Sequence, residues 1–315
     1  MLTVVMYHYV RDPAGTRYPS LKSLATAEFD AQLDHLARHH RVVGVEAVIE
    51  AVLDPPGRLP ANAALLTFDD GFREHLTYVL PRLIERGWQG SFFPSSRPVL
   101  REQVLDVHKL HFVLATGVPI DELVQWLCAM LDERRRAYDL PPTKEYWRRL
   151  AVASRFDPPE VIFVKRLLQR ELPEALRAEL TGALFRRYVT DDEAAFAREL
   201  YVSCDDLRRM HAAGMYIGHH GATHRWLDAL PAAEQAREVE EGLEFLVRIG
   251  APADRWVIAY PYGAHTADLR AQVHAHGGVV GLTTATAVAD LARHDPLALP
   301  RLDTNDLPPR RAGGN

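Results

Sequence analysis

Two adjacent carboxylates, Asp69 and Asp70, follow a short apolar run and precede Gly71 in the stretch Leu-Leu-Thr-Phe-Asp-Asp-Gly. Neighbouring carboxylates at a strand end repel each other unless positive charge lies beside them. A metal ion would supply that charge, with one carboxylate bound to it and the other free to move protons. Because Asp and Gly are also ordinary turn residues, the stretch taken alone is better explained as a turn.

His220 and His224 make the metal interpretation stronger. They are four residues apart, so in a helical turn both imidazoles would lie on the same side and could hold one ion. A carboxylate and two imidazoles leave coordination positions open for water, which is typical of a catalytic metal site. The alternative is that this His-rich loop is only polar surface.

These residues must be positioned by strands that alternate with helices. Apolar runs predict strands over 2–7, 41–45, 63–68, 90–94, 215–218, 256–260 and 279–283. Helical spacing predicts helices over 26–39, 46–53, 74–86, 204–214, 231–250 and 267–276. The alternation predicts an α/β fold with a parallel sheet. His8, the Asp pair, the His pair and the turn Pro261–Gly263 all follow predicted strands, at the edge where ligands bind in such folds.

The segment 99–201 differs from the rest of the chain. Strand signals nearly vanish there, and charged helical patterns cover 120–136, 144–153 and 161–170. We therefore expect a helical insertion into a core formed by 1–98 and 202–307, followed by a disordered tail over 308–315. The insertion is either a solvated helical surface or a lid over a binding site. His108 and Lys109, near its start, could contact a substrate or simply lie on a helix surface.

The composition is that of an ordinary globular protein: 47% of residues are apolar, 25% are charged and the net charge is −5. This balance gives no basic surface for nucleic acid. The N-terminus shows no signal peptide, and no apolar run is long enough for a membrane helix. Cys128 and Cys204 are far apart and are expected to be thiols of a reducing compartment. We therefore expect a cytoplasmic protein.

In combination, the motifs resemble the polysaccharide deacetylases with a NodB homology domain, carbohydrate esterase family 4. The first motif of that family is present as Thr67–Gly71, the second is similar to His220–His224, and the third is similar to Tyr260–Gly263. Met6–Val10 resembles the Tyr-His element found near the N-terminus of many members. The resemblance covers roughly 1–98 and 202–304. It implies a distorted or incomplete (β/α) barrel with a helical insertion, rather than an open doubly wound sheet.

The resemblance also implies roles for individual residues. The implied metal ligands are Asp70, His220 and His224, and the implied general base is Asp69. His8 is the candidate general acid, the backbone N–H of Tyr262 would bind the oxyanion, and Pro261 and Tyr262 would contact the substrate. The metal would be a divalent ion. Zinc suits this ligand set best, and cobalt, nickel or manganese would also fit.

Three positions depart from the family pattern. Gly221 stands where the family usually has Ser or Thr, so an orienting hydroxyl is missing. Ala259 stands where an Arg usually supports the base, and Arg301 could supply that charge from another strand. His219 occupies a place more often filled by Ser or Asn, and its role could be structural.

The resulting functional hypothesis is a metal-dependent hydrolase of an amide C–N bond. The expected reaction is removal of an acetyl group from an amino sugar that is small or carrier-linked. A cyclic imide or ureide is an alternative substrate within the same class. A non-catalytic sugar-binding protein with the same fold is the alternative from another class, and the missing Arg and the change at Gly221 favour it. The oligomeric state is left open by the sequence.

Overall fold

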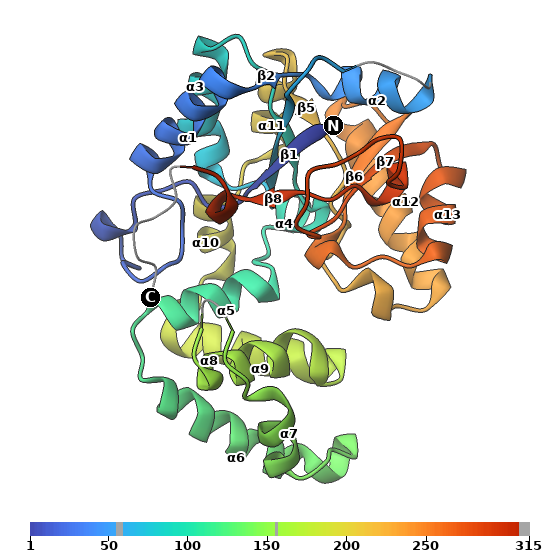
Figure 1. Ribbon diagram of the computed structural model, residues 1–315. Coiled ribbons are helices and arrows are strands. Elements are labelled where there is room, and N and C mark those ends of the chain that lie inside the picture. The colour runs from blue at the N-terminus through green and yellow to red at the C-terminus, as the bar shows by residue number, and fades with distance from the viewer. Residues whose placement is uncertain (55–58, 155–156, 309–315) are drawn as a thin grey trace. The chain divides into compact units, whose positions relative to one another are not determined.

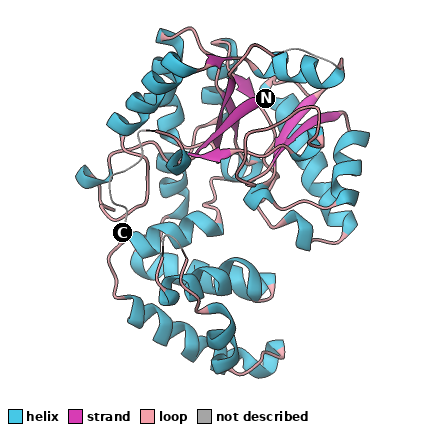
Figure 2. Ribbon diagram, in the orientation of Figure 1, coloured by secondary structure: helices cyan, strands magenta, loops and turns pink. Residues whose placement is uncertain are grey.

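The computed structural model describes residues 1–54, 59–154 and 157–308 of the chain (Figure 1). They form two compact units, which are described separately. The barrel unit comprises 1–12, 23–103 and, of the described residues, 197–308, and the helical unit comprises 13–22 and 104–196. Figure 2 shows the strands confined to the barrel unit. Of the tail predicted over 308–315, the residues 309–315 lie outside the described residues.

The barrel unit is built on parallel strands. They are β1 (Leu2–Tyr7), β2 (Arg41–Val42), β3 (Ala63–Asp69), β4 (Ser91–Phe93), β5 (Tyr216–Ile217), β6 (Trp256–Ala259), β7 (Gly278–Leu282) and β8 (Leu302–Asp303). The ladders run in the order β5-β4-β3-β1-β8, with β2 beside the start of β3, and β6 pairs with β7. This arrangement confirms the α/β fold with a parallel sheet.

Two isolated bridges join these sheets into a ring. His219, directly after β5, pairs with Ile258 of β6, and Leu282 of β7 pairs with Leu299, shortly before β8. The backbone N–H of His219 donates to the carbonyl of Val257 at 3.0 Å, and that of Thr283 donates to the carbonyl of Leu299 at 2.8 Å. The ring therefore closes through short contacts instead of full ladders. The barrel is distorted, as expected, but its hydrogen bonds run all the way round.

Helices of the barrel unit cover the outside of the strands. They are α1 (Thr26–His39), α2 (Val45–Leu53), α3 (Leu80–Glu85), α4 (Ser96–Arg101), α11 (Cys204–Ala212), α12 (Ala232–Ile249) and α13 (Ala267–Ala275). In α1 the buried positions Phe29, Leu33 and Leu36 form one apolar face, as the spacing predicted. Figure 1 shows α12 and α13 beside β6 and β7.

The helix predicted over 74–86 is interrupted. Residues His75–Val79 form a π-helical turn, and α3 begins only at Leu80. The N–H of Leu80 donates to the carbonyl of His75, which lies five residues back. Pro81 follows, and because it has no N–H it cannot bond to the carbonyl of Thr77, so the regular α-helical ladder is broken here.

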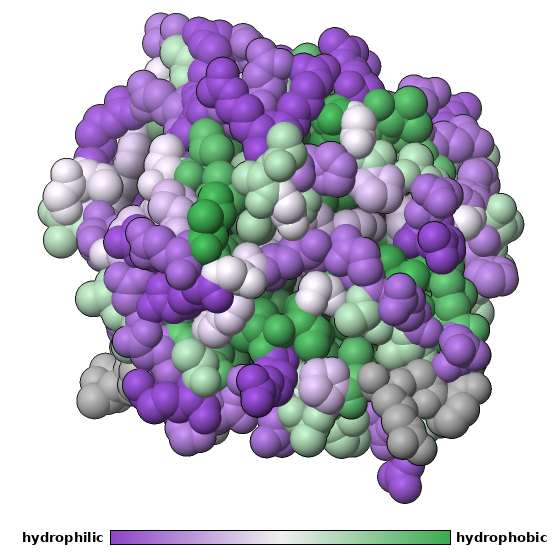
Figure 3. Space-filling model, turned by 90° about the horizontal axis from the view of Figure 1, so that it is seen from above, coloured by the Kyte–Doolittle hydropathy of each residue, from purple (hydrophilic) through white to green (hydrophobic). Residues whose placement is uncertain are grey.

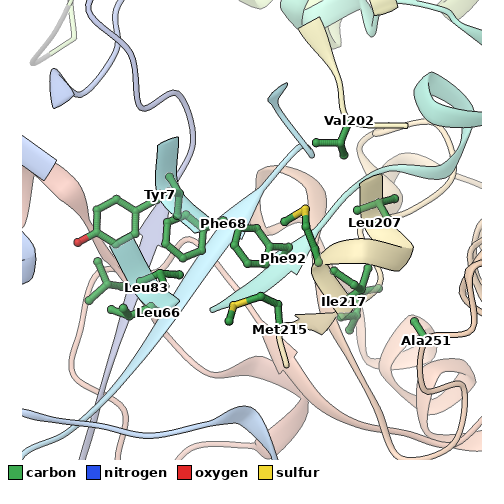
Figure 4. Packing of buried hydrophobic residues seen from close by; sticks show 14 of the residues in the cluster. Tyr7, Leu66, Phe68, Leu83, Phe92, Val202, Leu207, Met215, Ile217 and Ala251 are labelled. Atoms are coloured by element: carbon green, nitrogen blue, oxygen red, sulfur yellow. The ribbon is translucent and has the colours of Figure 1, made fainter. Parts of the chain in front are cut away.

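Alternation along the strands separates two layers of the core. In β3, Ala64, Leu66 and Phe68 pack in the cluster that includes residues of α1, α3 and α12, while Ala63 and Leu65 pack in the other cluster with residues of several strands and of α2. Figure 4 shows the aromatic part of the outer layer, where the Phe68 ring lies 4.8 Å from that of Phe92. Since side chains alternate, Thr67 and Asp69 continue the row of Ala63 and Leu65 on the inner side.

The helical unit contains no strand among its described residues. Its helices are α5 (Asp106–Ala115), α6 (Ile120–Tyr138), α7 (Thr143–Leu150), α8 (Pro159–Arg166) and α9 (Glu174–Tyr188), and the border with the barrel unit falls within α10 (Glu193–Leu200). A leucine-rich core joins α6 and α9. The helix predicted over 161–170 ends earlier, because residues Leu167–Glu171 form a π-helical turn.

The borders of the helical unit differ from the predicted insertion, 99–201. The loop over 13–22, expected to belong to the core, packs with the helical unit. The ring of Tyr18 lies 4.9 Å from that of Phe112 and 6.0 Å from that of Phe196, and Lys22 forms an ion pair with Asp157. Within the described residues, no helix is both long enough and apolar enough to cross a membrane. The face seen in Figure 3 is mostly hydrophilic, with apolar areas between the polar ones.

Candidate metal centre and active site

Three side chains meet at the carboxyl end of β3. Asp70, His220 and His224 offer ligand atoms that all lie within 4.8 Å of one another, the one such group among the described residues. The Oδ1 atom of Asp70 lies 3.3 Å from the Nε2 atom of each imidazole. All three side chains are almost completely buried. The structure therefore brings together the three residues that the motifs predicted as ligands.

A turn of the backbone at Asp70 directs its carboxylate toward His220 and His224. Alternation would place Asp70 on the outer side of the barrel, but its φ of 75° takes it out of the strand. Its N–H still donates to the carbonyl of Phe93 at 2.9 Å. Gly71 follows with φ 71°, and a Cβ there would lie 2.7 Å from the Cβ of Pro94. The Asp-Gly pair is thus needed for its backbone geometry as well as for its charge.

The two histidines approach each other without the helical turn that their spacing predicts. Residues 220–224 form an irregular loop in which Gly221 has φ 67° and His224 has φ 57°. Their ring centroids are 4.9 Å apart. The helical expectation was wrong because two left-handed residues, and not a 3.6-residue period, return the chain to the same side.

The hydrogen bond at Nδ1 of His220 indicates that its Nε2 is available as a ligand atom. Nδ1 lies 2.6 Å from the carbonyl oxygen of Ala259, which can only accept, so Nδ1 carries the proton. In a neutral ring, Nε2 then points its lone pair at Asp70 across 3.3 Å, which requires a cation or a proton between them. Burial opposes a proton, but the charges of Asp70 and Asp69 outweigh it and raise the pKa of His220.

This donor set fits a divalent cation. One carboxylate oxygen and two imidazole nitrogens are the ligands of open catalytic sites, which leave further positions for water or substrate. The carbonyl of Ala259 fixes one imidazole in the orientation that ligation needs. The buried triad is consistent with a divalent metal site, and its geometry does not select one metal.

Asp69 has a different partner from its neighbour. Both of its carboxylate oxygens accept from Arg301, at 2.9 Å from Nη1 and 2.8 Å from Nη2, in a fully buried pair. Arg301 also donates to the carbonyl of Thr283 and to the hydroxyl of Thr67. Burial acts to raise the pKa of Asp69, but the charge and hydrogen bonds of Arg301 outweigh it and lower that pKa. The charge missing at Ala259 is therefore supplied from the segment just before β8.

His8 lies on the other side of Asp69. Its Nε2 is 3.9 Å from Oδ2 of Asp69, and its side chain is 40% exposed. The carbonyl of His8 is 2.9 Å from Nε2 of His75, which lies in the buried π-helical turn. Burial lowers the pKa of His75, so this imidazole is neutral and donates to the carbonyl. His75 was not predicted as a site residue, and the sequence gives no signal for it beyond its place after the Asp-Asp-Gly turn.

Pro261 and Tyr262 stand beside the second histidine. Pro261 is buried, while Tyr262 has φ 57° and packs its ring edge against His224 at 4.7 Å between centroids. The ring of Trp226 stacks on the ring of Tyr262, with 4.3 Å between the ring centroids and an interplanar angle of 2°. The hydroxyl of Thr284 donates to the carbonyl of Tyr262. The structure thus places the third motif against His224, one of the candidate metal ligands.

His108 and Lys109 belong to the helical unit. His108 is 1% exposed in α5, and the Lys109 ammonium lies 3.0 Å from Oε1 of Glu193 and 3.6 Å from Oδ1 of Asp106. Both side chains are thus held within their own unit. A substrate contact by either residue stays a prediction.

His219 is buried, and both of its ring nitrogens form hydrogen bonds with backbone groups. The N–H of Gly221 donates to its Nδ1 at 3.0 Å, so Nε2 carries the proton and donates to the carbonyl of Val239 at 3.1 Å. A Cβ on Gly242 would lie 1.9 Å from that Nε2, which explains a glycine in the middle of α12. Burial lowers the pKa of His219 to about 4, so the ring is neutral near pH 7.

The fold and the site define an α/β barrel with a candidate divalent-metal centre at the carboxyl end of its strands. The family model of polysaccharide deacetylases matches residues 179–280, a range that includes the second and third motifs. No curated protein matches the chain by sequence.

Solved structures with this fold include several deacetylases. The Streptococcus pyogenes deacetylase PplD, in complex with acetate, has a TM-score of 0.58 at 14% identity, covering 96% of this chain and 91% of that one. IcaB from Ammonifex degensii has a TM-score of 0.53 at 18% identity, covering 96% and 89%. The deacetylase domain of BpsB from Bordetella bronchiseptica has a TM-score of 0.54 at 14% identity, covering 96% and 95%. These neighbours show the fold, and the family model matches the segment that holds the second and third motifs, in agreement with the resemblance to the polysaccharide deacetylases.

Proposed function

We propose that this protein is a metal-dependent hydrolase that removes the acetyl group from an amino sugar. The observation that carries the proposal is that the two adjacent carboxylates at the end of β3 have different partners. Asp70 shares a site with His220 and His224, while the adjacent Asp69 faces Arg301 and His8. Such a pairing of a cation site with separate proton-transfer groups is what metal-assisted amide hydrolysis uses.

Asp70, His220 and His224 would hold the cation. When bound there, a divalent ion supplies Lewis-acid polarisation of a carbonyl oxygen and makes water more acidic; zinc is our first choice, and cobalt, nickel or manganese would fit the same donors. Asp69 would accept a proton from the attacking water. Arg301 keeps that carboxylate ionised and fixed in direction, because it binds both oxygens in a buried pair.

His8 would deliver a proton to the leaving nitrogen. It lies 3.9 Å from Asp69, and its side chain is partly exposed, so it can exchange protons with solvent. An amine leaves poorly until it is protonated, so an acid on this side completes the reaction. Tyr262, beside His224, would present its backbone N–H to the oxyanion, and Pro261 and Tyr262 would contact the sugar.

An N-acetylated sugar is the substrate class that the neighbours support. One was solved as a deacetylase in complex with acetate, and another, from Aggregatibacter actinomycetemcomitans, is described as a de-N-acetylase. We propose that the sugar is small or carrier-linked and that the enzyme acts in the cytoplasm, as expected from the sequence. Fractionation of the native host with antibodies would test the location.

The direct test is acetate release from a panel of N-acetylated amino sugars by protein reconstituted with Zn²⁺, Co²⁺, Ni²⁺ or Mn²⁺. We expect turnover that Asp69→Asn abolishes and that His8→Gln lowers by about 10²–10⁴-fold. Asp34→Asn, on an exposed carboxylate paired with Arg86, is the matched control and should leave turnover unchanged. Metal-loaded wild type that releases no acetate from any sugar would contradict the substrate class.

The non-catalytic alternative loses one of its two arguments. It was favoured by the absence of a supporting Arg in the third motif, and the two hydrogen bonds from Arg301 to Asp69 support Arg301 in that role instead. If folded wild-type protein bound N-acetylated sugars but no metal, that alternative would replace the proposed enzyme.

A further inference from the structure

One buried carboxylate holds the loop between the two metal histidines. Glu238, on α12, is only 2% exposed. Its Oε2 accepts from the backbone N–H groups of Ala222 at 2.8 Å and Thr223 at 3.0 Å. Its Oε1 accepts from the hydroxyl of Thr223 at 2.5 Å and from Nη2 of Arg225 at 3.2 Å. Four donors from one short loop therefore converge on a single side chain.

The loop needs such an acceptor because it is neither helix nor strand. Gly221 and His224 are both left-handed, so no regular ladder serves the N–H groups between them. A left-handed His is strained and persists only where its surroundings fix it. Glu238 binds the two residues directly before His224, so it acts on the segment that aims this imidazole.

The opposite side of the loop is held mainly by backbone groups. The carbonyl of His220 accepts from the hydroxyl of Ser95 at 2.9 Å. The carbonyls of Gly221 and Ala222 accept from the N–H groups of Ser96 and Arg97. The loop is thus clamped between 95–97 and Glu238. Of these two anchors, Glu238 is the one that a single side-chain change removes.

Arg225 compensates the buried charge of Glu238. Its Nη1 also lies 2.8 Å from Oε2 of Glu234, one turn earlier on α12. Glu234 does not bond to the loop amides, and its side chain is 38% exposed. The two glutamates therefore carry the same charge and share the same arginine, but only Glu238 contacts the backbone before His224.

We infer that Glu238 is a positioning residue that sets the metal affinity of the site by fixing the 222–223 amides and thereby the direction of His224. This inference rests on the metal site of the proposed function. Outer partners of metal ligands typically change affinity by about 10–100-fold when removed. Glu238→Gln keeps the size of the side chain but turns an NH₂ group toward donors, so it should raise the dissociation constant for Zn²⁺ by about 10–100-fold.

The test is a competitive titration of metal-free protein with Zn²⁺ and a chromogenic chelator, together with the visible absorption of the Co²⁺-loaded protein. Glu234→Gln is the matched control, because it removes a nearby charge and a partner of Arg225 but no hydrogen bond to the amides of Ala222 and Thr223. We expect Glu238→Gln to weaken Zn²⁺ binding and to alter the Co²⁺ spectrum. Glu234→Gln should resemble wild type in both measurements.

Each outcome decides the inference. Equal affinity and an unchanged Co²⁺ spectrum in Glu238→Gln would overturn it, as would equal losses in both glutamate variants, which would indicate a charge effect only. If Glu238→Gln fails to fold, Thr223→Val removes one donor from the same contact and should still weaken binding; wild-type affinity there would overturn the inference. A wild-type protein that binds no cation would contradict the metal site itself, and so the proposed function as well.

Discussion

The two carboxylates at the end of β3 belong to regions built in different ways. Asp69 continues the alternation of its strand into the barrel interior, where Arg301 binds it through two hydrogen bonds. Asp70 leaves the strand with a left-handed backbone and faces a loop that holds His220 and His224. We call these the strand side and the loop side of the site.

The comparison shows which contacts fix the positions of the side chains on each side of the site. On the strand side, position follows from the pleat, and the buried ion pair with Arg301 completes the geometry without a metal ion. On the loop side, Asp70, Gly221 and His224 all adopt backbone conformations that are costly for most residues, and contacts outside the loop must hold them. The strand side should therefore contribute more to stability, and the loop side more to metal binding.

The largest expected effect comes from breaking the strand side. Arg301→Met leaves Asp69 as a buried charge without its partner, so it should lower the free energy of unfolding by about 3–5 kcal/mol. Urea unfolding of metal-free protein measures this loss. Arg208→Met, which breaks an exposed pair with Asp205, should stay within about 0.5 kcal/mol of wild type.

A double variant refines this prediction. Adding Asp69→Leu to Arg301→Met removes both charges and should recover part of the lost stability, because no buried charge is then left unpaired. A single variant as stable as Arg208→Met would mean that the strand side does not depend on this pair.

The second prediction concerns the pH dependence of the loop side. Burial lowers the pKa of His219 to about 4, against an ordinary value of 6.5. Between pH 6.5 and about 4, His219 is protonated in the unfolded chain but neutral in the folded protein. Its contribution to the free energy of unfolding therefore falls as the pH drops through this range. The full shift corresponds to about 3 kcal/mol.

His219→Asn tests this contribution, because its amide oxygen could still accept from the N–H of Gly221 but the side chain cannot titrate. Unfolding free energies of both metal-free proteins, measured between pH 4 and 7, should show a flatter slope in the variant. Equal slopes would mean that His219 is not the group held neutral.

Much of the strand side could be predicted from the sequence. The apolar run before Asp69 predicts a strand, and the motif assigns the two carboxylates. Arg301 was considered only because Ala259 lacks the usual charge. What the sequence could not provide is the distance between them, since Arg301 lies far along the chain and reaches Asp69 only when the ring of strands closes.

The loop side was predicted in composition but not in geometry. A spacing of four suggested a helical turn, because positive φ at His224 has no sequence signal in a residue that is not glycine. Glu238 looks like any acidic residue of an amphipathic helix, and its role follows from which face of α12 meets the loop. The same holds for 13–22, whose packing with the helical unit depends on Tyr18 and Lys22 contacts that no local pattern encodes.

The third prediction is that Asp70→Asn separates metal binding from folding. Asn tolerates the left-handed backbone, so the fold should be kept, but its neutral oxygen is a poorer ligand. We expect the dissociation constant for Zn²⁺ to rise by about 100-fold or more, at least the effect of removing an outer partner. Metal content after dialysis and the urea midpoint measure the two properties, and Asp34→Asn serves as the exposed control. Retained metal in Asp70→Asn would remove Asp70 from the ligand set.

The smallest effect expected is at Gly221, where the family usually has a hydroxyl-bearing residue. Gly221 has φ 67°, and an added Cβ would lie 3.2 Å from Oε2 of Glu238. Gly87 has φ 64° with nothing within 4 Å of the corresponding position. In both Gly→Ala variants the free energy of unfolding should therefore fall by about 1–2 kcal/mol because of the left-handed backbone. Only in Gly221→Ala would the added Cβ lie in close contact with the carboxylate of Glu238.

Comparing the two alanine variants isolates that contact from the backbone cost. Zn²⁺ titration should show weaker binding in Gly221→Ala and wild-type binding in Gly87→Ala, although both lose similar stability by urea unfolding. If metal affinity fell equally in both, the loop side would be responding to general destabilisation. If it fell in neither, the glycine would serve only the turn, and the metal histidines would be aimed independently of the space between Gly221 and Glu238.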